Sequence, residues 1–137
     1  MQKTDYPLWA RDTIRYGDTD KQGHVNNAVF STFLETGRVQ FLLNSGQPIR
    51  APGTNFVLAR LVLDYKAEML WPGEADIGTR VKSVGKSSFV LEQIVMQGDT
   101  VTAVAETVMV MVDEKTRKSC PLPEASAAAL TALKNNI

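Results

Sequence analysis

The sequence predicts an α+β fold in which one antiparallel sheet wraps around a single long helix. The first observation is a strand-like segment near the N-terminus, followed by a helical segment with one continuous apolar face. The second is a series of four further strand-like segments, separated by short runs of turn-forming residues. Because the helical segment is too apolar to lie on a surface, we expect the sheet to cover it.

The first strand is expected over Leu8–Tyr16, where Trp9 and Ile14 favour extended backbone. The loop Gly17–Gly23 follows it and is rich in residues that form turns.

The long helix is expected to begin at Asn26 or Asn27 and to end near Leu43. Asn is a favoured N-cap, because its side chain accepts from the first unpaired N–H groups. The run Asn44-Ser45-Gly46 is a typical helix end. The apolar face follows the helical spacing and consists of Phe30, Phe33, Leu34, Gly37, Phe41 and Leu42.

The remaining strands follow a stretch of helix and strand breakers, residues 47–55. They are expected over Phe56–Lys66, Ala75–Val84, Ser88–Gln97 and Thr100–Val112. Three breaks between them predict hairpins and therefore a meander: Trp71-Pro72-Gly73, Gly85-Lys86-Ser87 and Gly98-Asp99. The last strand ends in VMVMV, so its end is expected to be central and covered. A short helix is expected over Pro123–Leu133, with Pro at its start.

Size and charge limit what the chain can be. Its 137 residues bury about two-thirds of the unfolded surface, enough for one core and not for two domains, so residues 1–137 are expected to form one domain. Fifteen Lys and Arg balance fifteen Asp and Glu, which argues against a binder of nucleic acid or membrane surfaces. There is no apolar run of about 18 residues and no apolar signal segment, so we expect a soluble, cytoplasmic protein.

Scarce residue types exclude several chemistries. Cys120 is the single cysteine, so no intrachain disulfide can form, and His24 is the single histidine. One of each cannot build the usual zinc shell, and the common phosphate-binding loops and the nucleophile elbow are absent. We therefore expect no metal and no cofactor. Cys120 has no histidine beside it in the sequence and is interpreted as a structural thiol.

The reactive groups gather in the segment YGDTDKQGHVNN, residues 16–27. It holds Asp18, Asp20, the only histidine and two amides just before an apolar helix. A helix N-terminus carries unpaired N–H groups that can stabilise an oxyanion, and a carboxylate beside it can attack or activate water. The alternative is structural: the two aspartates shape turns and Asn26 only caps the helix.

This segment resembles the opening motif of hotdog-fold thioesterases of the 4-hydroxybenzoyl-CoA thioesterase-like family. Supporting similarities occur at the turn Trp71-Pro72-Gly73-Glu74 and at Gly85-Lys86-Ser87-Ser88-Phe89, and the resemblance covers roughly residues 8–125. It implies a curled sheet around a central helix, and an acyl-CoA thioesterase that acts as a homodimer or a homotetramer. It also implies an active site at the dimer interface.

The resemblance also implies roles for individual residues. The second aspartate of the motif, Asp20, is the catalytic carboxylate, either as nucleophile or as general base, and the N–H of Asn27 polarises the thioester carbonyl. The supporting loop residues are Asp18, Gly23, His24 and Asn26. Residues that meet the CoA phosphates are expected at Arg60, Lys86, Ser87 and Ser88. The acyl pocket is expected to be lined by Phe30, Phe33, Val62 and Met69.

Two other functions fit the same resemblance. One is a hotdog hydratase or dehydratase using Asp20 and His24, although the pattern G-D-x-N-P-x-H of those enzymes is missing. The other is a non-catalytic module that binds acyl-CoA or an acyl carrier. Glu35 invites comparison with enzymes that use a helix glutamate, and we interpret it as a structural residue paired with Arg38 at i+3.

Overall fold

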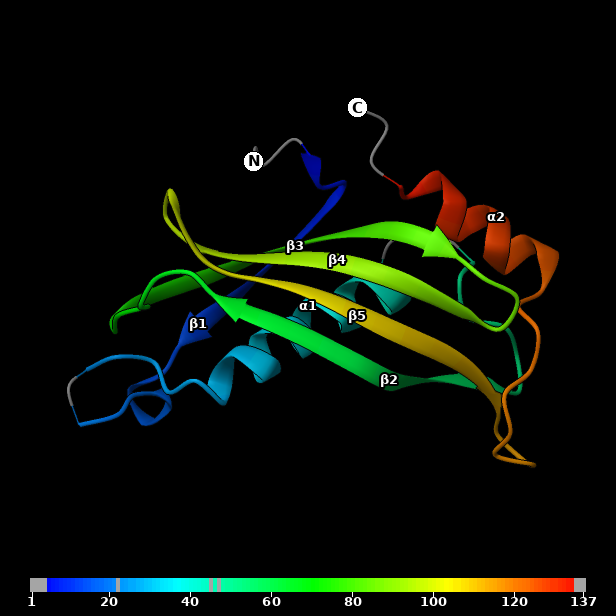
Figure 1. The fold of residues 1–137 in the computed structure, drawn as a ribbon, viewed down its shortest axis with the longest axis horizontal. Coiled ribbons are helices and arrows are strands. Elements are labelled where there is room, and N and C mark those ends of the chain that lie inside the picture. The colour runs from blue at the N-terminus through cyan, green and yellow to red at the C-terminus, as the bar shows by residue number, and fades with distance from the viewer. Residues whose placement is uncertain (1–4, 22, 45, 47, 135–137) are drawn as a thin grey trace.

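The computed structural model describes residues 5–21, 23–44, 46 and 48–134, and in it one sheet curls around one long helix (Figure 1). The predicted α+β architecture is therefore confirmed. In chain order the elements are β1 (Leu8–Ile14), the 3-10 turn η2 (Tyr16–Asp18), α1 (Val29–Asn44), β2 (Thr54–Tyr65), β3 (Gly73–Val84), β4 (Ser88–Gln97), β5 (Thr100–Asp113) and α2 (Glu124–Ala132).

The strand order is β1-β3-β4-β5-β2, and all neighbours are antiparallel. Two of the predicted hairpins, at Gly85-Lys86-Ser87 and at Gly98-Asp99, are confirmed. The third is wrong, because β2 pairs with β5 at one edge and β3 pairs with β1 near the other. The connection from β2 to β3 is longer than a tight hairpin turn. It is anchored at the end of the sheet by Met69, which is fully buried and accepts the Val25 N–H.

The start of α1 differs from the prediction by two to three residues. The Asn26 side chain accepts the N–H of Ala28 at 3.0 Å, and tight turns from Asn26 and Asn27 precede the first helical residue, Val29. Asn26 therefore caps the segment that leads into the helix, two residues before the position of an N-cap of α1 itself. At the other end Asn44 is the last helical residue and Gly46 has a φ of 79°; Ser45 of the predicted end lies outside the described residues.

The hydrophobic core lies between α1 and the concave face of the sheet. Phe33, Leu34 and Phe41 of the helix are almost fully buried, as the spacing predicted. The end of β5 is central, between β4 and β2, and its Met109 and Met111 are buried. The alternate residues of β5, among them Val110, are only half-buried, so the sheet is covered on one face and partly open on the other.

Gly37 brings α1 unusually close to the sheet. A Cβ atom at this position would lie 2.5 Å from Cγ2 of Ile77 and 2.9 Å from Nε2 of Gln93. The helix therefore tolerates a residue of poor helix propensity because no larger one fits against β3 and β4.

We expect Gly37→Ala to destabilise the protein by about 1–3 kcal/mol, because overpacking outweighs the gain in helix propensity of roughly 1 kcal/mol. Denaturant unfolding measures the difference. Gly17→Ala is the matched control, since a Cβ at Gly17 meets nothing within 4 Å. A Gly37→Ala protein that is as stable as the wild type would contradict the close packing of α1.

Candidate active site

A cavity of about 400 Å³ lies at the N-terminal end of α1. Three parts of the chain form it: the loop before α1, the first turn of the helix, and the end of β2 with the connection that follows. In Figure 1 this is the end of the molecule opposite α2. Its lining residues are Asp20, His24, Val25, Asn26, Asn27, Phe30, Tyr65, Ala67, Glu68 and Met69.

Asp20 begins a tight loop that His24 closes. The N–H of Asp20 donates to the carbonyl oxygen of His24 at 2.8 Å, and the N–H of His24 donates to Oδ1 of Asp20 at 3.2 Å. Gly23, with a φ of 80°, supplies the left-handed turn between them. The loop thereby holds an exposed carboxylate at the cavity wall, where the sequence predicted the catalytic acid.

Asp18 occupies a different environment from Asp20. It is buried, with 8% of its surface exposed, and its Oδ2 accepts the Arg15 N–H at 2.8 Å and lies 3.5 Å from Nε of Arg15. Its carbonyl oxygen accepts the Asn26 N–H at 2.8 Å. Asp18 does not line the cavity, so its contacts fit a residue that shapes the loop.

Asn27 presents an available backbone donor to the cavity. None of the hydrogen bonds among the described residues uses its N–H, whereas its carbonyl oxygen accepts the Tyr65 hydroxyl at 2.9 Å. Tyr65 in turn packs edge-to-face on Phe30, with ring centroids 5.3 Å apart. The first residues of the helix are thus fixed by β2, while the Asn27 N–H stays free to bind an oxygen atom of a ligand.

Glu68 lines this cavity although the sequence did not predict it. Its Oε2 lies 2.6 Å from Nε2 of His24 at the edge of the cavity. Glu68 belongs to the connection after β2, where no periodicity or motif marks it. Its contact with His24 arises only because Val25 and His24 pair with Met69 and Leu70 across the end of the sheet.

The structure does not bring the predicted CoA residues to this cavity within one chain. Lys86, Ser87 and Ser88 form the turn between β3 and β4, beside α2 at the other end of the sheet (Figure 1). Lys86 is exposed, and its carbonyl oxygen accepts the Leu122 N–H. Arg60 is exposed on the edge strand β2, and no carboxylate of the described residues lies within 4 Å of it.

Two of the four predicted acyl-pocket residues line this cavity, and two do not. Phe30 and Met69 line the cavity. Phe33 is instead fully buried in the core, because it points between α1 and the sheet. Val62 lies on β2 beside Asp64 and Arg80, at a different cavity. The predicted pair of Glu35 and Arg38 is wrong, since the two side chains form no ion pair within 4 Å and Arg38 turns toward Gln93.

The described residues contain neither a cluster of metal ligands nor a helix suited to a membrane. Within 5–21, 23–44, 46 and 48–134, no three His, Cys, Asp or Glu side chains gather closely enough to hold a metal ion. Over the same part of the chain, no helix has the length and apolarity needed to cross a membrane.

Comparison with known proteins places this geometry in a family. The profile of the thioesterase-like superfamily matches residues 14–130, which include the loop, α1 and the whole sheet apart from most of β1. The chain belongs to this superfamily. Its activity is accordingly that of a thioester hydrolase, and the predicted hotdog thioesterase is confirmed.

Individual relatives agree with this assignment. Acyl-CoA thioester hydrolase YbgC of Escherichia coli O6:H1 is 30% identical over 119 residues, which cover 84% of this chain and 89% of that protein. A thioesterase of Thermus thermophilus, solved in complex with coenzyme A and Zn, is 31% identical with a TM-score of 0.84, covering 97% of this chain and 98% of the other. The PA5185 protein of Pseudomonas aeruginosa superimposes with a TM-score of 0.85 at 25% identity, covering 98% and 96%.

Proposed function

We propose that this thioester hydrolase acts on acyl-CoA, with the reaction centred on Asp20 and the Asn27 N–H. The observation that carries the proposal is their position on one cavity, with an exposed carboxylate on the loop and a backbone donor at the start of α1. The relative named as an acyl-CoA thioester hydrolase and the related structure that contains coenzyme A support CoA as the thiol carrier.

The chemistry needs only these two groups and water. The thioester carbonyl oxygen accepts the Asn27 N–H, which stabilises the oxyanion together with the positive end of the α1 dipole. Asp20 either attacks the carbonyl carbon, giving an anhydride that water then opens, or removes a proton from the attacking water. In both routes the C–S bond breaks, CoA leaves as the thiol after taking up a proton, and the acid is released.

His24 and Glu68 support this reaction by fixing the loop. The 2.6 Å contact between their side chains ties the loop to the connection after β2, and the His24 backbone bonds to Asp20 hold the carboxylate at the cavity wall. The hydratase alternative would instead need His24 to face the substrate, whereas its Nε2 is engaged by Glu68.

A second copy of the chain would bring the distant Lys86 turn to the cavity. β2 is an edge strand with exposed apolar side chains, namely Val57, Leu58, Val62 and Tyr65. If two copies pair antiparallel along β2, the start of one β2 lies beside the end of the other. Because the Lys86 turn lies near the start of β2 and Asp20 near its end, each site then combines Asp20 of one copy with Lys86 of its partner. A homodimer or a dimer of dimers satisfies this arrangement.

The test of the function is a panel of acyl-CoA substrates with a thiol-reactive dye. Release of free thiol supports thioester hydrolysis. Hydration of an unsaturated acyl-CoA without release of thiol would support the hydratase. Saturable binding without turnover would support the acyl-CoA or acyl-carrier binding module.

We expect Lys86→Ala to raise the KM for acyl-CoA by several-fold and to leave kcat nearly unchanged, because the lysine meets phosphates far from the reacting carbonyl. High salt should reduce the difference in KM between the wild type and Lys86→Ala, since exposed charges are screened. Lys82→Ala is the control, because Lys82 pairs with Glu106 on the sheet at 2.9 Å. An unchanged KM in Lys86→Ala would remove this turn from the CoA site.

A further inference from the structure

A second cavity, of about 280 Å³, lies between the second half of α1 and the first half of β2. It shares no lining residue with the cavity at Asp20. Arg38, on its wall, follows Asn27 by eleven residues and therefore lies about 16 Å further along the helix axis. Six apolar residues line it: Val39, Leu42, Leu43, Phe56, Leu58 and Met109.

Arg38 is a buried cation without a close anion. Only 7% of its surface is exposed. Its hydrogen bond among the described residues is a long one, 3.4 Å from Nη1 to Oε1 of Gln93. The Gln93 amide is held in place, because its Nε2 donates to the Leu34 carbonyl oxygen and to Oγ1 of Thr79, each at 3.1 Å. No carboxylate of the described residues lies within 4 Å of the guanidinium.

This arrangement leaves hydrogen-bonding capacity unused. Burial lowers the pKa of Arg38, and the charge of Glu35 opposes that effect by raising it. The guanidinium remains protonated and has five N–H donors. Among the described residues the buried side-chain polar atom without a partner is Thr107 Oγ1, so the Arg38 N–H groups that lack a protein acceptor are reached by solvent in the cavity. An anion in the cavity would satisfy them.

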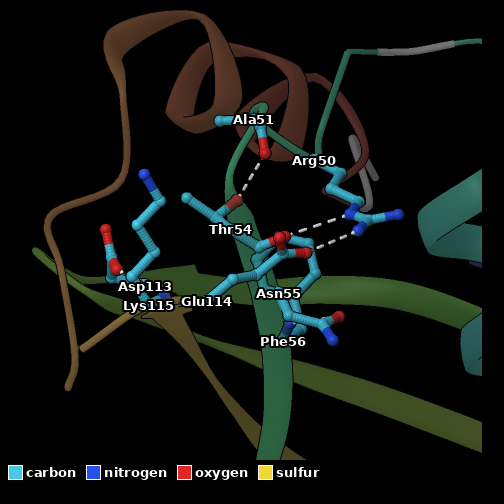
Figure 2. A network of polar contacts seen from close by, with 8 residues as sticks. All are labelled: Arg50, Ala51, Thr54, Asn55, Phe56, Asp113, Glu114 and Lys115. Atoms are coloured by element: carbon cyan, nitrogen blue, oxygen red, sulfur yellow. Dashed lines mark hydrogen bonds and ion pairs between the residues drawn. The ribbon is translucent and has the colours of Figure 1, made fainter. Parts of the chain in front are cut away.

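The other polar residues of the cavity restrict which anion fits. Arg50 stands at the mouth and is already engaged, with the Thr54 carbonyl oxygen and Oε1 of Glu114 each at 3.1 Å (Figure 2). Glu35 is exposed and lines the same cavity, so its charge disfavours a dianion such as phosphate. A single planar carboxylate matches the guanidinium fork, and the apolar walls suit an aliphatic tail.

We propose that this cavity binds an aliphatic carboxylate, with its carboxylate on Arg38 and its chain along the apolar walls formed by α1 and β2. Two sources share this chemistry. One is a free aliphatic acid, and the other is the far carboxylate of a dicarboxylic acyl group. The second source rests on the proposed acyl-CoA thioesterase function and on the pairing of two copies along β2, because the roughly 16 Å between Asn27 and Arg38 of one chain exceeds the length of an eight-carbon acyl group. The first source rests on neither.

The test is calorimetric titration of the intact protein with octanoate, with 1-octanol as the uncharged probe of equal chain length. Octanoate is expected to bind more tightly than 1-octanol, and Arg38→Met is expected to weaken octanoate about tenfold or more by removing charge-assisted hydrogen bonds. Glu35→Gln is expected to change affinity in the opposite direction and strengthen octanoate binding, because it removes a negative charge from the same cavity. Asp20→Asn should leave octanoate binding unchanged, which separates this site from the catalytic proposal.

Two results of the titration with wild-type protein would overturn the proposal. One is failure of octanoate to bind, and the other is equal binding of octanoate and 1-octanol. If Arg38→Met does not fold, Glu35→Gln decides: stronger octanoate binding supports the proposal and unchanged binding refutes it. The hydrolysis rates of octanedioyl-CoA and octanoyl-CoA then separate the two sources. A preference for octanedioyl-CoA that is lost in Arg38→Met shows that the site binds the far carboxylate of a dicarboxylic acyl group. Equal rates show that it binds a free aliphatic acid.

Discussion

Asp20→Asn is expected to reduce kcat for acyl-CoA hydrolysis by about 10²–10⁴-fold, the usual contribution of a general base. The amide keeps the size of the carboxylate but can neither attack the thioester nor accept a proton at neutral pH. It also retains an oxygen to accept the His24 N–H, which Oδ1 of Asp20 now accepts. The loop should therefore keep its shape and the KM should change little. Steady-state kinetics measure the effect, and circular dichroism confirms the fold.

Asp18→Asn is the matched control two residues away. Asp18 is buried against Arg15 and does not line the cavity, and an asparagine oxygen can still accept the Arg15 N–H. We expect a much smaller loss of kcat than in Asp20→Asn. A folded Asp20→Asn protein with near wild-type turnover would refute the mechanism and move the search for the reacting group to Glu35 or His24.

The spacing of apolar and turn-forming residues along the sequence was sufficient to predict the bounds of α1 and of the strands to within a few residues. The buried positions of α1, such as Phe33, Leu34 and Phe41, follow from a helical period that the sequence displays directly. The pairing of β2 with β5 rather than with β3 was not predictable in the same way. Strand pairing depends on where a connection crosses the sheet, and this connection is set by the burial of Met69 and its bond from Val25.

In the candidate site, too, the residues that are close in sequence were predictable and those that folding brings from elsewhere were not. Asp20, His24, Asn26 and Asn27 are close in sequence and meet on one cavity, as their spacing before a helix suggested. Glu68 and Tyr65 join them from a segment about forty residues later, through contacts that only the folded sheet creates. Arg38 shows the limit of the i+3 rule, because that rule describes exposed helix faces and Arg38 faces the core.

Disruption of the β2 edge is expected to abolish both assembly and activity. The double substitution Val57→Lys and Val62→Lys replaces two apolar side chains that are 45% and 40% exposed on this strand. In an antiparallel pair of β2 strands the four added cations would lie along one shared edge, where like charges oppose pairing. We expect a monomer by sedimentation velocity. Turnover should fall by roughly 10²-fold or more, because substrate positioned by only one copy loses its productive geometry.

The control adds the same charge elsewhere on the molecule. Ala125→Lys and Ala128→Lys place two lysines on the exposed face of α2, away from the β2 edge, and should leave both sedimentation and turnover unchanged. Two results would contradict the shared site. A Val57→Lys, Val62→Lys monomer with full turnover would show that one chain holds a complete active site. An assembly that resists this substitution would show that the copies join through another surface, and the Lys86 turn would then need a different route to the Asp20 cavity.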